Sequence, residues 1–176
     1  MDNYNVMYEK LPNLVFGFHG CNKDTYEKVL YKHKDLKKSD NKYDWLGNGW
    51  AEKRYENPAV LGAIIDLGRC LNLTDDHTSS ILRRGYEMLK IKCETTDNDM
   101  PQNRSGKSKT DILLRDLDCA VIQQIHEYNS ETKQPGYDSV RGVFEEGEEV
   151  YPGSALREKT HIQLCIVNPN CIKGFF

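Results

Sequence analysis

The stretch "AVLGAIIDLGRCLNL", residues 59–73, is an almost unbroken run of aliphatic and β-branched residues. Such a run is typical of a central strand that is buried on both faces. We therefore expect one continuous strand across residues 59–73, with the rest of the domain arranged around it.

Towards the N-terminus, the apolar segment 13–21 predicts a strand that ends in a turn. A helix is expected to follow it, with Asn22 or Asp24 as the N-cap. After the central run, apolar residues at helical spacing predict a second helix, capped by Asp76 or Thr78.

In the second half of the chain, leucine, valine and isoleucine recur every four residues and predict an amphipathic helix across residues 110–128. Strands are predicted at residues 138–144, 161–167 and 171–176. Strands at both ends of the chain with helices between them favour an α+β domain over a βαβ repeat.

Composition narrows the class of protein. The chain has 176 residues and a formal net charge of −3, which fits one domain and argues against nonspecific attraction to nucleic acid or to an anionic membrane. No apolar run reaches the roughly 20 residues that a membrane-spanning helix needs. The N-terminal residues lack the pattern of a signal peptide, so we expect a cytoplasmic protein.

The six cysteines show no Cys-x-x-Cys pair. Without a secretory signal the thiols are expected to stay reduced, so we predict buried free cysteines, with zinc binding as the less favoured alternative. The cysteines are Cys21, Cys70, Cys93, Cys119, Cys165 and Cys171.

Two polar segments carry motifs that are better explained as solvated surface. Gly106-Lys107-Ser108 matches the end of a phosphate-binding loop, but Pro101 stands where that motif needs its first glycine. The acidic run 145–150 follows a predicted strand and lacks the spaced partners of a cation site, so we interpret it as a hairpin end.

Two strands place polar residues where a ligand could lie. His19-Gly20 closes the first strand, and a glycine there lets a flat ligand approach the main chain, with an ordinary turn histidine as the alternative. Alternation along the strand "THIQLCIV" predicts a core face and a second face that is either half-exposed or a cleft wall. The core face holds Ile162, Leu164 and Ile166, and the second holds His161, Gln163 and Cys165.

Together these residues resemble the ADP-ribosyltransferase superfamily, in its diphtheria-toxin and poly(ADP-ribose) polymerase-like branch. His19-Gly20 in "LVFGFHG" matches the first signature element of that branch, and Gly47-Asn48-Gly49 in "KSDNKYDWLGNG" matches the donor loop and glycine turn of the second. The closing strands "HIQLCIVNPNCIKGFF" match the third element and put Gln163 at the catalytic position, with His161 or Glu158 there if the register slips.

The resemblance implies a fold of split mixed or antiparallel sheets with flanking helices, and NAD as substrate. His19 would bind the adenosine ribose and Gly20 would hold the nicotinamide carboxamide through its backbone. The donor loop would bring Tyr43, Trp45 and Gly49 to the cofactor. The catalytic residues would be His19 and Gln163, with Gln163 holding a ribose hydroxyl while positive charge develops on the sugar.

The sequence departs from the family pattern at two places. Gln163 is neutral, where a carboxylate would stabilise the developing cation more strongly, so chain elongation is not expected. The Ile-Tyr-Phe segment that should follow Gly49 is missing, and "WAEKRYENP" begins directly. Our hypothesis is that the natural polypeptide carries further residues between Gly49 and Trp50.

The resemblance implies a mono-ADP-ribosyltransferase that modifies a protein or nucleic-acid acceptor, as a bacterial toxin, effector or phage-defence enzyme. An antitoxin or inhibitor would be a natural partner for such an enzyme. The alternatives are an inactive NAD- or ADP-ribose-binding module of the same fold, and an interaction protein with no nucleotide site. Gln163 and the missing tyrosine favour the module.

Overall fold

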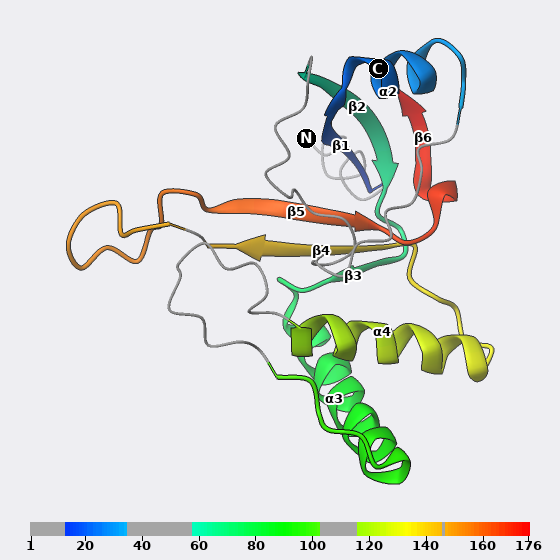
Figure 1. The fold of residues 1–176 in the computed structure, drawn as a ribbon, viewed down its shortest axis with the longest axis vertical. Coiled ribbons are helices and arrows are strands. Elements are labelled where there is room, and N and C mark those ends of the chain that lie inside the picture. Colours follow the sequence, from blue (N-terminus) through cyan, green and yellow to red (C-terminus); the bar gives the residue numbers. More distant parts are fainter. Residues whose placement is uncertain (1–12, 35–57, 103–115, 146) are drawn as a thin grey trace, which may run out of the picture.

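The structure is a computed structural model of the whole chain, and it describes residues 13–34, 58–102, 116–145 and 147–176. These residues form a mixed α+β arrangement of two small sheets and three α-helices (Figure 1). The elements are β1 (Leu14–Asn22), α2 (Lys23–Leu30), β2 (Pro58–Asp66), β3 (Cys70–Asn72), α3 (Asp76–Thr96), α4 (Asp116–Glu131), β4 (Ser139–Phe144), β5 (His161–Ile166), the 3-10 turn η2 (Pro169–Cys171) and β6 (Ile172–Phe175).

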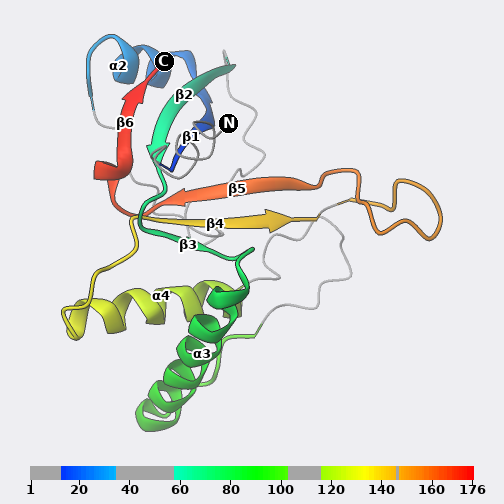
Figure 2. The same ribbon diagram turned by 180° about the vertical axis from the view of Figure 1, so that it is seen from behind.

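Each sheet has three strands. The first has the order β1-β2-β6 and both of its pairings are antiparallel. The second has the order β3-β4-β5, with β3 parallel to β4 and β5 antiparallel to it. Figures 1 and 2 show β3-β4-β5 in the middle of the molecule, with α3 and α4 at one end and the first sheet with α2 at the other.

The prediction of one strand across residues 59–73 is wrong, because the chain turns between β2 and β3 and passes from one sheet to the other. The carboxylate of Asp66 accepts a hydrogen bond of 2.9 Å from the backbone N–H of Gly68. An aspartate that bonds the backbone two residues on stabilises a turn, so "DLGR" is the turn signal inside an otherwise apolar run.

The helix caps follow the expected chemistry, with one shift of position. Asn22 caps α2 by accepting 2.7 Å from the N–H of Thr25, as predicted. The cap of α3 is Asp75, whose side chain accepts from the N–H of His77, so the prediction of Asp76 or Thr78 is wrong by at least one residue. The same helix ends at Asp97, which adopts a left-handed backbone conformation.

Two separate apolar clusters hold the described residues together. The larger lies between the sheet β3-β4-β5 and the helices α3 and α4, and the smaller lies between the sheet β1-β2-β6 and α2. The larger contains Leu71, Leu89, Cys93, Val121, Ile122, Ile125, Val140, Phe144 and Cys165. The smaller contains Cys21, Val29 and Leu61. None of the six cysteines forms a disulfide in the structure, and four of them are buried, which confirms most of the expected burial.

The two faces of β5 are the reverse of the prediction. Cys165 is only 6 % exposed and belongs to the larger cluster, whereas Ile162 is 57 % exposed. In an antiparallel pair, residues directly opposite each other point to the same side. Because Val140 and Phe144 of β4 are buried and lie opposite Cys165 and His161, the face with Gln163 is the one that the helices cover.

The two sheets meet around Asp138, at the start of β4. Its carboxylate receives two hydrogen bonds from the guanidinium of Arg69, at 2.9 and 2.6 Å, and one of 2.7 Å from the side-chain amide of Asn168. Its backbone carbonyl accepts from the N–H groups of Val167 and Asn168, and its own N–H donates to the carbonyl of Arg69. Asp138 therefore joins the segments that lead into β3, out of β5 and towards β6.

No helix in the described parts of the chain has both the length and the apolar character that crossing a membrane requires.

We expect the substitution Asp138→Asn to lower the free energy of unfolding by about 1–2 kcal/mol at pH 7. It removes the carboxylate charge from a bidentate ion pair, and the exposed Arg69 guanidinium lets solvent screen part of that interaction. Pairing with Arg69 lowers the pKa of Asp138. Its contribution is present above the usual carboxylate pKa and is lost as the pH falls through and below about 4. The difference between wild type and variant should therefore shrink in acid.

Urea unfolding at several pH values measures this difference. The matched control is Glu127→Gln, which breaks a more exposed pair with Lys92 at the same 2.6 Å separation and should cost less than about 0.5 kcal/mol. Equal losses in the two variants would show that Asp138 is an ordinary surface partner.

A second prediction concerns Gly85, which is buried where α3 crosses α4. A Cβ atom there would lie 2.6 Å from Ile125 and 3.2 Å from Val121. The substitution Gly85→Ala gains about 1 kcal/mol of helix propensity but forces overpacking that costs about 1–3 kcal/mol, so we expect a net loss. Thermal unfolding measures it, and Ser79→Ala on the exposed face of α3 should leave stability unchanged or raise it. A higher thermal stability of the Gly85→Ala variant would show that α3 and α4 can move apart without losing packing energy.

Candidate functional site

The dipeptide His19-Gly20 lies near the end of β1, as the sequence predicts. His19 is paired with Leu61 of β2 and is exposed, whereas Gly20 is buried. The side chain of His19 lies on the same face as Cys21 and Leu61, which pack against α2. β1 therefore carries an exposed imidazole beside a buried glycine.

The backbone N–H and C=O of Gly20 point away from β2, towards the outer side of β1 in the three-stranded sheet that the described residues form. The N–H and C=O of Gly62 both bond to Phe176, at 2.9 Å each, on the β6 side of β2. Gly62 lies opposite Phe18, so these two residues form a pair without mutual hydrogen bonds, and the polar groups of Phe18 point away from β2. Hydrogen bonding alternates along a strand, so the N–H and C=O of Gly20 also point outward.

Such a glycine offers one donor and one acceptor side by side. A primary carboxamide carries the complementary acceptor and donor, and the absence of a side chain lets it come close to the main chain. The donor and acceptor of Gly20 are the groups that a carboxamide would match, and the residue itself is buried.

Desolvation lowers the pKa of His19, although the residue is exposed. The shift keeps the imidazole neutral at neutral pH. A neutral imidazole has one donor and one acceptor nitrogen, which suits a sugar hydroxyl.

Gln163 is held by the histidine two residues before it on β5. The side-chain nitrogen of Gln163 lies 2.7 Å from Nε2 of His161, and Nδ1 of His161 lies 2.7 Å from the carbonyl oxygen of Lys159. A carbonyl only accepts, so Nδ1 carries the proton, Nε2 accepts, and the amide of Gln163 donates. His161 also stacks on Phe144, with the ring centroids 6.0 Å apart.

This arrangement orients the amide of Gln163. With its nitrogen donating to His161, its oxygen remains able to accept a hydrogen bond from a ligand hydroxyl. The sequence signal for the pairing is the spacing of two residues on a strand, which puts both side chains on one face. The sequence predicts His161 on the same strand face as Gln163 and as an alternative to it, but not as its hydrogen-bond partner.

The predicted site residues are distributed over both sheets. His19 and Gly20 belong to β1-β2-β6, whereas Gln163 belongs to β3-β4-β5. The structure thus brings together His19 with Gly20 and Gln163 with His161, but it does not put the two pairs on one sheet. Glu158 precedes β5, and its carboxylate lies 3.4 Å from the backbone N–H of Glu148.

Three predicted cofactor contacts, Tyr43, Trp45 and Gly49, lie outside the described residues. The junction between Gly49 and Trp50 lies there too, so the hypothesis of additional residues at this point stays a prediction. In the described ranges, no group of three or more His, Cys, Asp or Glu side chains is arranged to hold a metal ion.

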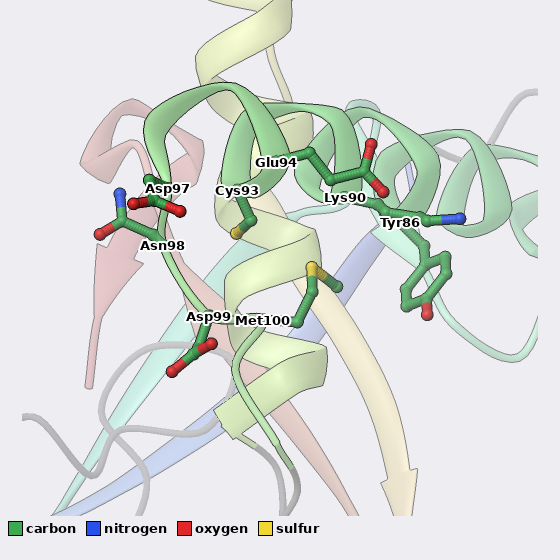
Figure 3. A pocket seen from close by; sticks show the side chains of 8 residues that line it. All are labelled: Tyr86, Lys90, Cys93, Glu94, Asp97, Asn98, Asp99 and Met100. Atoms are coloured by element: carbon green, nitrogen blue, oxygen red, sulfur yellow. The ribbon is translucent and has the colours of Figure 1, made fainter.

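A cavity of about 270 Å³ lies at the C-terminal end of α3, away from the predicted site residues (Figure 3). The sulfur atoms of Cys93 and Met100 lie near its middle, with Asp97 and Asp99 to one side and Tyr86 to the other. Its lining residues are Tyr86, Lys90, Cys93, Glu94, Asp97, Asn98, Asp99 and Met100. The mixed charges on an open helix end give this cavity no recognisable ligand chemistry.

Comparisons with protein-family models, with curated proteins and with solved structures gave no match.

The hydrogen bonds of His161 predict its tautomer. In the neutral imidazole we expect the proton on Nδ1, with Nε2 as the acceptor from Gln163. Two-bond nitrogen–proton NMR correlations distinguish this tautomer from the one with its proton on Nε2.

The variant Gln163→Leu should remove the hydrogen bond at Nε2 of His161 and leave the bond between Nδ1 and the Lys159 carbonyl in place. A ring with its proton on Nε2 in the wild type would contradict the arrangement.

Proposed function

We propose that this protein is an NAD-dependent mono-ADP-ribosyltransferase that transfers ADP-ribose to a protein or nucleic-acid acceptor. The observation that carries the proposal is the outward-facing backbone of Gly20, whose donor and acceptor match a nicotinamide carboxamide. The neighbouring His19 supplies a neutral imidazole for a ribose hydroxyl. The fold proposed with it is the two-sheet ADP-ribosyltransferase arrangement with flanking helices.

Gln163 is assigned the catalytic position in this proposal. Its amide oxygen would accept from a hydroxyl of the nicotinamide ribose while the bond to nicotinamide breaks and the sugar becomes cationic. A neutral amide stabilises that cation less than a carboxylate does, which fits a slow transferase that adds one ADP-ribose at a time. His161 acts here as a positioning residue, because it fixes which atom of the amide is free.

A second candidate function is an NAD- or ADP-ribose-binding module without turnover. The position of Gln163 on a different sheet from His19 favours this alternative. Both functions need Gly20 and His19, so NAD binding is common to them and nicotinamide release separates them.

The experiment is measurement of nicotinamide release from NAD, with and without mixed protein or RNA acceptors, together with calorimetric titration of NAD. We expect slow release by the wild type. His19→Ala and Gln163→Ala should each lower the rate by about 10- to 100-fold, because each removes a hydrogen bond to the reacting nucleotide. His77→Ala, at the exposed start of α3, is the matched control and should leave the rate unchanged.

The substitution Gln163→Glu distinguishes most clearly between the transferase and the binding module. A carboxylate at the catalytic position should raise the rate of nicotinamide release, since it stabilises the cationic sugar more strongly than the amide does. NAD binding without release in any variant would select the module. No binding at all would exclude both functions and leave an interaction protein.

A further inference from the structure

One face of the first sheet is apolar and exposed. It carries Leu14 at 44 % exposed, Phe16 at 70 %, Phe18 at 63 %, Val60 at 59 % and Phe176 at 48 %. We call these five residues the aromatic face. Alternation on β1 and the pairing of Gly20 with Val60 put them on the side of the sheet opposite α2.

The phenylalanine rings of the aromatic face contact one another in a defined geometry. The ring of Phe176 meets Phe16 edge to face at 5.7 Å and Phe18 at 6.1 Å between centroids. It lies directly over Gly62, where an added Cβ would be 2.4 Å from the ring. The glycine therefore provides the space that lets three phenylalanine rings form one platform across β1, β2 and the C-terminal end of β6.

We propose that the aromatic face is the contact surface of a symmetric homodimer, in which a second copy packs its own first sheet against it face to face. Neither β1 nor β2 brings a charged side chain to the middle of this face. Phe18 lies opposite Gly62 there, and Gly20 lies opposite Val60. A surface whose middle carries no charge is complementary to itself, as a two-fold interface requires, and the ion pair of Asp66 with Lys173 borders it at the Leu14 end. A charged partner would leave its own charges buried and unpaired.

The exposed area suits a weak dimer. Three phenylalanines of about 200 Å² each, between 48 % and 70 % exposed, together with two aliphatic side chains, give roughly 500 Å² per copy. Two copies then bury about 1,000 Å², which is at the lower limit for a specific interface. Sheets that pack face to face in this way lie about 10 Å apart and bury side chains from both inner faces. The inference does not depend on NAD or on the proposed function.

Sedimentation velocity on the 176-residue chain, without NAD, tests the dimer over a range of about 1–200 µM. The expected result is a monomer–dimer equilibrium in the micromolar range. The double variant Phe16→Ser with Phe18→Ser should weaken the dimer by about a hundredfold or more, because each substitution occurs twice in a symmetric interface. Its circular dichroism should match that of the wild type.

The matched control is Tyr151→Ser with Leu156→Ser, which removes two side chains, each 60 % exposed, from the loop between β4 and β5. It should dimerise as the wild type does. If the phenylalanine double variant does not fold, Val60→Lys at the same face provides the second test, since an inserted charge should also separate the copies.

Four outcomes would overturn the proposal. They are a monomer at every concentration, a dimer that is insensitive to Phe16, Phe18 and Val60, open-ended assemblies in place of a dimer, and a monomer whose aromatic face is protected from hydroxyl-radical labelling. The last of these would mean that another part of the same chain covers the face.

Discussion

The hydrogen bonds of Asp138 are the constraint on which the described structure depends. Within the described residues the chain passes between the two sheets twice, once through residues 67–69 and once through residues 167–171. Asp138 bonds to both crossings, through Arg69 on one side and through Val167 and Asn168 on the other. Its carboxylate is much less exposed than its partner guanidinium, so removing the charge would leave a polar gap at the point where the sheets meet. Each sheet has its own apolar cluster, and this polar junction fixes one relative to the other.

The separation of the core into two apolar clusters limits where on each sheet a ligand could bind. A sheet covered by helices on one face buries that face, so ligand contacts come from strand ends, free edges and the uncovered face. In the proposed site, His19 and Gly20 would use the end and the edge of β1. Gln163 lies on the covered face of β5, where His161 satisfies its amide nitrogen and where a polar group without a partner would be costly. Its hydrogen bond is therefore structural as it stands, and a catalytic role would use the remaining oxygen.

The sequence predicted most elements but not the division between the sheets. Periodicity located β1, α2, α3 and β4 to β6 within a few residues, because each buries one face and repeats at its own period. It missed the turn after Asp66, since an apolar composition dominates "AIIDLGRCL" and the turn depends on one side-chain hydrogen bond. It also reversed the faces of β5, because Ile162 and Cys165 are both apolar enough to suit either face, and only the pairing with Val140 decides between them. The dipeptide His19-Gly20 could be placed on its strand from sequence, whereas the orientation of its backbone depends on Phe176, more than 150 residues away.

Both the proposed nucleotide contact and the aromatic face depend on a single register. On β1, residues whose backbone bonds to β2 alternate with residues whose backbone points outward, and the side chains alternate with the same period. Phe16, Phe18 and Gly20 fall in the outward set, so the strand that carries the aromatic face continues to a glycine whose donor and acceptor point away from β2. A slip of one residue would turn the rings towards α2 and return the glycine backbone to β2. The bond from the N–H of Leu67 to the carbonyl of Asn13, at 2.7 Å, and the pairing of Gly62 with Phe176 hold the register at opposite sides of β2. The same two constraints therefore decide whether the strand can bind a carboxamide at its edge and a second copy at its face.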